Sequence, residues 1–207
     1  MSSSYKSLGI RPVINANFTL TKLGGSLMPT EVRQAMLSAA QSFVDMHDLQ
    51  ERVGELLAEI TRNEAAFVSC GAASGLLLAT AACISKVSGV TYESFPNPTG
   101  TENEVIVQQM HRNPYDYAVL QAGASLVEIG TMESTSLEDL ENAYSSSTVA
   151  IFWFQGVTEY LMNQPNELSL EKVIQSAKKQ GIPVIVDGAA GLPPSAIFGI
   201  LLSKEQT

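Results

Sequence analysis

Between residues 65 and 187, the sequence alternates short apolar runs with stretches of helical periodicity. Near-continuous apolar strands separated by helices are typical of a mostly parallel sheet with helices on both faces, so we predict an α/β fold. The predicted strands are 65–69, 104–108, 125–129, 148–154 and 184–187, and the predicted helices between them are 72–84, 115–122, 137–144 and 168–180.

The N-terminal region has a different pattern. Residues 1–28 are irregular and are predicted to form an N-terminal arm. Pro29-Thr30-Glu31 predicts the start of a helix, because proline suits the first helical turn and an early glutamate complements the helix dipole. A second helix is predicted from Asp48. Residues 29–207 are interpreted as one large domain.

Composition excludes several classes of function. The 207 residues include 12 basic and 21 acidic side chains, a net charge of -9, which argues against a broad nucleic-acid surface. The two cysteines, Cys70 and Cys83, are too few for a disulfide framework. The N-terminus does not resemble a signal peptide, and no apolar run is long enough to span a membrane. We therefore expect a cytoplasmic protein without nucleic-acid or membrane partners.

Small residues follow the predicted strand at 65–69, in the segment Ser69–Gly75 (SCGAASG). Such a strand-to-helix turn leaves helix N-terminal amides open to a phosphate group, and Ser74 adds a hydroxyl. The glycine spacing matches neither a Walker loop nor a dinucleotide fingerprint. Close packing of the helix on its neighbours is the alternative explanation for these small residues.

Two further side chains are candidates because of their place at strand ends. His111 follows the predicted strand at 104–108, where open α/β sheets bind ligands and where an imidazole can stack on a cofactor ring. A surface histidine beside Arg112 is the alternative. Asp187 ends an apolar strand, and a buried carboxylate needs a partner such as a protonated pyridine nitrogen. Capping of the following turn explains Asp187 equally well, whereas no companion residues support a metal site.

In this order, the three features resemble fold-type I pyridoxal 5′-phosphate (PLP) enzymes. More narrowly, the chain is similar to the short relatives of bacterial selenocysteine synthase that include ammonia-lyases of the D-glucosaminate-6-phosphate type. The matching segments are RPVINAN (11–17), LTKLGGSLMP (20–29), FVDMHDLQERVGELLAEIT (43–61), EAAFVSCGAASGLLLATAACI (64–84), EVIVQQMHRNPYDYAVLQAGASLVEIG (104–130) and VIVDGAAGLPP (184–194).

The resemblance implies PLP as the cofactor and a role for each matching residue. The turn after residue 70 would bind the cofactor phosphate, the histidine would stack on the ring, and the strand-terminal aspartate would pair with the pyridine nitrogen. Thr21, Gly25 and Ser26 match a segment that lies over the active site and holds the substrate carboxylate. The implied cofactor-binding residues are Gly71, Ala72, Ala73, Ser74, His111 and Asp187.

The resemblance ends at Pro194. In the family, a further strand, a Gly-Gly-Lys or Gly-His-Lys motif with the Schiff-base lysine, and a small C-terminal domain are expected after this point. Residues 195–207 do not match, and we interpret them as an anomalous tail caused by a lost base near codon 196. Lys204 lacks the expected sequence context, so no catalytic residue is assigned. The domain is therefore predicted to be an incomplete PLP-binding large domain that is inactive alone.

The parent reaction implied by the resemblance is α,β-elimination and deamination of a 2-amino acid or amino-sugar acid to a 2-keto product. Two alternatives stay open. One is a PLP-dependent selenium or sulfur transferase similar to L-seryl-tRNA selenium transferase. The other is a non-catalytic chain that pairs with another subunit. A small amino-acid-like substrate and a homo-oligomer are expected in the parent family.

Overall fold

A computed structural model of the chain describes residues 5–16, 21–98, 100, 102–154 and 166–188. By its internal contacts, the chain divides into two compact units, residues 1–49 and 50–207. The boundary predicted from the sequence, between an arm ending at residue 28 and a large domain, stays a prediction.

The first unit contains short helical segments. They are the 3₁₀ turns η1 (Tyr5–Leu8) and η2 (Thr21–Leu23), helix α1 (Thr30–Ala39) and the first turn of α2 (Met46–Thr61). Helix α1 begins where the sequence predicts, with Pro29 at its N-cap position. No residue of α1 is buried, and the apolar side chains of Leu37 and Phe43 are fully or largely exposed.

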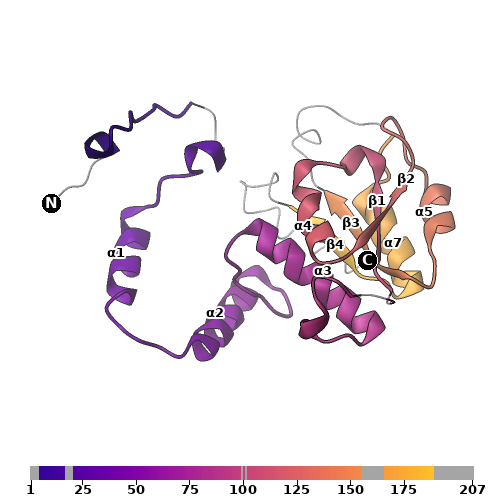
Figure 1. Ribbon diagram of the computed structural model, residues 1–207, viewed down its shortest axis with the longest axis horizontal. Helices are drawn as coiled ribbons and strands as arrows, with labels where there is room; N and C mark the ends of the chain where they lie inside the picture. The colour runs from indigo at the N-terminus through magenta and orange to yellow at the C-terminus, as the bar shows by residue number, and fades with distance from the viewer. Residues whose placement is uncertain (1–4, 17–20, 99, 101, 155–165, 189–207) are drawn as a thin grey trace. The chain divides into compact units, whose positions relative to one another are not determined.

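The second unit is built on a four-stranded parallel sheet, which confirms the predicted fold class (Figure 1). The strand order is β2-β1-β3-β4. Strands β1 and β3 at the centre of the sheet are apolar runs that are buried along almost their whole length, whereas the edge strand β2 is only partly buried. The strands have the predicted bounds, namely β1 (Glu104–Gln108), β2 (Ser125–Ile129), β3 (Thr148–Phe154) and β4 (Val184–Asp187).

Helices cover both faces of this sheet, and each face has its own hydrophobic core. On one face, α3 and α4 pack on alternate strand residues such as Val105 and Phe152. On the other face, α5 and α7 pack on residues such as Ile106 and Trp153. No helix in the described ranges combines the length and apolar content needed to cross a bilayer. The helices are α3 (Ala72–Ser88), α4 (Tyr117–Gln121), α5 (Leu137–Ala143) and α7 (Leu170–Gln180), with 3₁₀ turns at Tyr92–Ser94 (η3), Gln109–His111 (η4) and Pro114–Asp116 (η5).

The direction of the chain across the sheet reverses between β1 and β3. From β1 the chain passes through α4, on one face, to β2 on one side. It then returns through α5, on the opposite face, to β3 on the other side of β1, and α7 continues that direction to β4. Right-handed crossovers require this change of face when the direction changes. Open α/β sheets bind ligands at such a reversal, at the carboxyl ends of the strands.

The predicted strand at 65–69 is wrong, because these residues pair with no strand that the structure describes. The segment lies instead along helix α2. Gln50 Nε2 donates to the carbonyl oxygen of Val68 over 3.2 Å. The buried Gly54 faces Ala66, where a Cβ atom on the glycine would lie 2.6 Å from the alanine carbonyl oxygen. The missing side chain of Gly54 therefore allows α2 to approach the segment that leads into α3.

Gly54→Ala is expected to destabilise this unit. Overpacking against a backbone carbonyl costs about 1–3 kcal/mol and outweighs the gain of up to about 1 kcal/mol in helix propensity. Urea unfolding followed by circular dichroism measures the loss. The matched control is Glu59→Ala at an exposed position of the same helix, expected to change stability by less than about 0.5 kcal/mol. Equal stability of Gly54→Ala and the wild type would contradict the close approach.

Candidate functional site

The candidate site is centred on His111, at the point where the direction of the chain reverses. His111 ends the 3₁₀ turn η4, directly after β1, and only 6% of its surface is exposed. Phe154 ends the neighbouring strand β3 and contacts His111 through its backbone amide. The carboxyl ends of the two strands that flank the reversal therefore meet at this imidazole ring.

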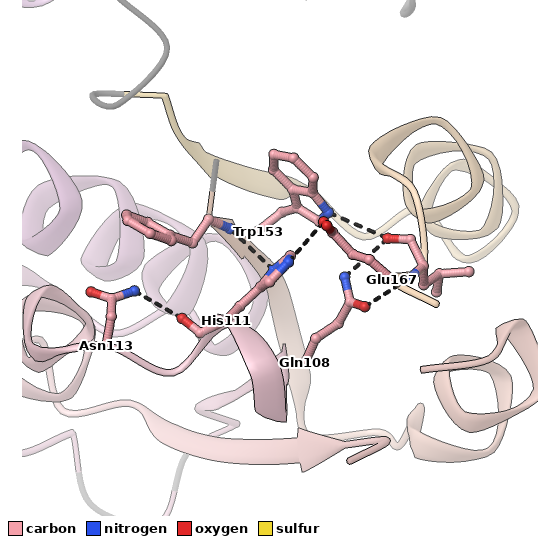
Figure 2. Close-up of polar contacts among 7 residues, drawn as sticks. Gln108, His111, Asn113, Trp153 and Glu167 are labelled. Carbon is pink, nitrogen blue, oxygen red and sulfur yellow. Dashed lines mark hydrogen bonds and ion pairs between the residues drawn. The ribbon is translucent and has the colours of Figure 1, made fainter. Parts of the chain in front are cut away.

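Both ring nitrogens of His111 have hydrogen-bond partners (Figure 2). The amide nitrogen of Phe154 donates to Nδ1 over 3.4 Å, and Nε2 lies 2.8 Å from Oε1 of Glu167. Since a backbone amide can only donate, Nδ1 accepts and carries no proton. The proton is therefore on Nε2, which donates to the Glu167 carboxylate. Both nitrogens at the ring edge are therefore hydrogen-bonded within the chain, and another group would contact the imidazole through a ring face.

Glu167 is held in place by a second set of hydrogen bonds. Gln108, the last residue of β1, donates from Nε2 to the Leu168 carbonyl and accepts from the Leu168 amide, both over 3.0 Å. The indole Nε1 of Trp153 donates to the same carbonyl over 3.4 Å. The Trp153 ring also meets the His111 ring edge to face, with centroids 5.2 Å apart. Strand residues thus fix both the ring and the backbone beside its carboxylate partner.

The loop after His111 is fixed by charged groups. Arg112 Nε donates to Asp116 over 2.5 Å, and the same guanidinium contacts Glu128 on β2. The hydrogen bond to Asp116 is the main reason that the pKa of Arg112 is raised above its ordinary value. Asn113 caps η5 and donates from Nδ2 to the His111 carbonyl over 2.8 Å. These contacts hold the backbone of His111 at the strand end.

Asp187 lies on the far side of β3 from His111. It ends β4, is 8% exposed and pairs in register with Phe154, the residue whose amide contacts His111. His111 and Asp187 are therefore both neighbours of Phe154 at the carboxyl edge of the sheet, His111 through a hydrogen bond and Asp187 through strand pairing. A carboxylate is costly to bury unless it is paired, and a cationic group is one such partner.

The predicted phosphate-binding turn forms the start of α3. Gly71 is the N-cap residue and has φ 139° and ψ 167°, a conformation almost restricted to glycine. The next amides, those of Ala72, Ala73 and Ser74, have no acceptor inside the helix, because the first turn of any α-helix leaves its donors unpaired. The Ser74 hydroxyl donates to the Gly71 carbonyl over 2.7 Å. It must rotate away from this bond to donate to a phosphate.

The other predicted site residues are not brought together with His111 by any described contact. Thr21 lies in η2, and Gly25 and Ser26 follow it, all in the first unit. Their role at the substrate carboxylate stays a prediction. Lys204 and the predicted anomalous tail, residues 195–207, lie outside the described residues.

The sequence pattern did not indicate a role for Glu167, Gln108 or Trp153. Gln108 could have been predicted to have a structural role, because it ends an apolar strand and a buried amide group requires hydrogen-bond partners. Glu167 precedes Ser169, the N-cap of α7, and such an acidic residue has the pattern of an ordinary helix start. Its partner is 56 residues away in the sequence, so local pattern carries no information on the contact.

Known proteins resemble this chain over most of its length. A family model described as SelA: L-seryl-tRNA selenium transferase matches residues 13–194. The chain is 32% identical over 190 residues to 5'-C-glycyluridine monooxygenase-decarboxylase of Streptomyces sp, covering 89% of this chain and 47% of that protein. It is 33% identical over 190 residues to D-glucosaminate-6-phosphate ammonia lyase of Salmonella typhimurium, covering 90% and 51%.

A solved structure of D-glucosaminate-6-phosphate ammonia-lyase matches with a TM-score of 0.80 at 30% identity. The match covers 90% of this chain and 51% of that one. The chain therefore spans about half the length of the curated relatives it matches.

Gly71→Ala is expected to strain the turn at the start of α3. A side chain in this φ/ψ region costs about 1–3 kcal/mol, although the space around Gly71 is open. Urea unfolding measures the cost, with the adjacent exposed Ala72→Ser as a control expected to change stability by less than about 0.5 kcal/mol. If Gly71→Ala unfolds at the same urea concentration as the wild type, the turn does not depend on glycine.

Proposed function

We propose, since the chain belongs to the L-seryl-tRNA selenium transferase (SelA) family, that residues 50–207 carry the cofactor-binding part of a PLP-dependent enzyme. The parent reaction that we propose is α,β-elimination and deamination of a 2-amino acid or amino-sugar acid to a 2-keto product. The observation that carries the proposal is the meeting of His111 and Asp187 at Phe154, beside the reversal of the strand order.

The chemistry of the described residues fits PLP. The cofactor has a phosphate group, a flat ring and a pyridine nitrogen, and the chain offers one suitable partner for each. The first turn of the 17-residue helix α3 offers amide donors and the positive end of its dipole to the phosphate. His111 offers an aromatic face because its nitrogens are already occupied. Asp187 offers a buried carboxylate to a protonated ring nitrogen.

The division of work between cofactor and protein follows from these partners. PLP, when bound, supplies an electron sink for the carbanion formed at the substrate α-carbon. Asp187 would hold a proton on the ring nitrogen, which would keep that sink effective. His111 would orient the ring by contact with its face. The turn at Gly71–Ser74 holds the phosphate end, and the lysine that would act as base is not among the described residues.

The transferase alternative is less well supported by the chain itself. Selenium or sulfur transfer needs a reactive thiol or a surface for tRNA. Burial raises the pKa of the Cys83 thiol, which opposes formation of its nucleophilic thiolate at neutral pH. The net charge of -9 opposes binding of tRNA phosphates. We therefore favour the lyase-type reaction on a small substrate with an amino-acid-like portion.

Two finer proposals concern assembly and location. We propose a homo-oligomer, because apolar side chains such as Met36, Phe43 and Ile60 are more than half exposed in this chain, and an isolated surface rarely exposes so many. We propose a cytoplasmic location, because Cys70 and Cys83 are free thiols.

Pyridoxamine 5′-phosphate tests the proposed site directly. It has the ring, phosphate and pyridine nitrogen of PLP, but its amine cannot form a Schiff base with surface lysines. Calorimetric titration should detect binding to the wild-type chain. Asp187→Asn should weaken the affinity by about tenfold or more, because a charge-assisted hydrogen bond contributes about 1.5–3 kcal/mol.

The matched control is Asp48→Asn, the same substitution at an exposed position in the first turn of α2. It should bind pyridoxamine 5′-phosphate like the wild type. Absence of binding to a folded wild-type chain, or equal affinity of Asp187→Asn and Asp48→Asn, would refute the proposed site.

A further inference from the structure

We infer that Glu167 is a positioning residue for His111: its carboxylate holds the Nε2 proton and thereby commits the imidazole to present its face, not a nitrogen, to the cofactor ring. The inference rests on the proposed function for the identity of that ring. The state of the imidazole itself depends only on the contacts within this chain.

The His111 ring carries its single proton on Nε2. The Phe154 amide donates to Nδ1, so this nitrogen has no proton, and Nε2 must supply the hydrogen for the 2.8 Å contact with Glu167. An imidazole in this arrangement has no free nitrogen. It cannot exchange a proton with a substrate without breaking one of the two bonds.

The His111 and Glu167 side chains are both largely buried. The side chains of His111 and Glu167 are 7% and 14% exposed, so water competes weakly for their hydrogen bond. A donor that lost its acceptor at this depth would be left unsatisfied. Glu167 therefore restricts rotation of the ring about its side-chain bonds, in concert with the edge-to-face contact from Trp153.

The backbone next to Glu167 is itself held by hydrogen bonds. The amide group of Gln108 bonds both the N–H and the C=O of Leu168, the residue next to Glu167. Gln108 ends β1 and His111 ends the 3₁₀ turn directly after it, so one strand end fixes both the ring and the backbone beside its partner (Figure 2). A polar contact between segments 56 residues apart is thereby kept within hydrogen-bond distance.

The test combines nitrogen NMR of the histidine rings with ligand binding. The chain has two histidines, His47 and His111, and His47→Gln leaves a single ring to observe. In this background we expect an unprotonated Nδ1 and a hydrogen-bonded Nε2 proton that exchanges slowly with water. Glu167→Ala should lose the slow Nε2 proton, whereas Glu167→Gln should retain it, because the amide oxygen accepts the same bond.

Pyridoxamine 5′-phosphate affinity is measured on the same proteins. Glu167→Ala should weaken binding by about three- to tenfold, the effect of one hydrogen bond, and Glu167→Gln should restore affinity to near the wild-type value. The matched control is Glu171→Ala, which removes the same charge from the exposed first turn of α7 and should change neither readout.

The two readouts separate failure of the positioning role from failure of the proposed function. A protonated Nδ1 in the wild-type chain, or a slow Nε2 proton that survives Glu167→Ala, overturns the positioning role whether or not the ligand binds. If the NMR results are as expected but the folded wild-type chain binds no pyridoxamine 5′-phosphate, the positioning of His111 stands and the PLP site is refuted.

Discussion

The parallel pairing of β1 with β3 is the constraint on which the rest of the site depends. It sets two strand ends side by side at the place where the chain reverses direction across the sheet. Helix α4 follows β1 and helix α7 follows β3, and the two helices lie on opposite faces of the sheet, which is the arrangement in which ligands bind at the carboxyl ends of the strands. His111 and Phe154 meet there, and pairing of β3 with β4 brings Asp187 into register with Phe154. The strand order thus gathers residues that are far apart in the sequence.

The sheet alone would leave the His111 ring free to turn. Its orientation comes from polar groups that the strands bury: the Phe154 amide, the Glu167 carboxylate and the Gln108 amide group. Each buried donor or acceptor in this set has a partner, so any one change leaves another group unsatisfied. The members of this network therefore stabilise one another, and the ring orientation follows from all of them together.

The sequence predicted the sheet well and the polar network poorly. Strands β1 to β4 have the predicted bounds, since a buried parallel strand is a continuous apolar run with polar or turn residues at both ends. The resemblance to selenocysteine synthase relatives is confirmed by the family match to residues 13–194. The segment 65–69 has the same apolar pattern but lies along α2. An apolar run forms a strand only where a neighbouring strand pairs with it, and the local pattern does not show whether one does. The hydrogen bond between Glu167 and His111 could not be predicted from the sequence, since it joins residues that are 56 positions apart and depends on the tertiary fold.

The most direct test of the account is an amide NMR titration of the chain with pyridoxamine 5′-phosphate. We predict that the largest shift changes fall on Gly71 to Ser74, on His111 and Phe154, and on Asp187, the residues proposed to bind the phosphate, the ring face and the pyridine nitrogen. Shift changes confined to another part of the surface, such as the cavity lined by Glu93, Phe95 and Asn97, would contradict it.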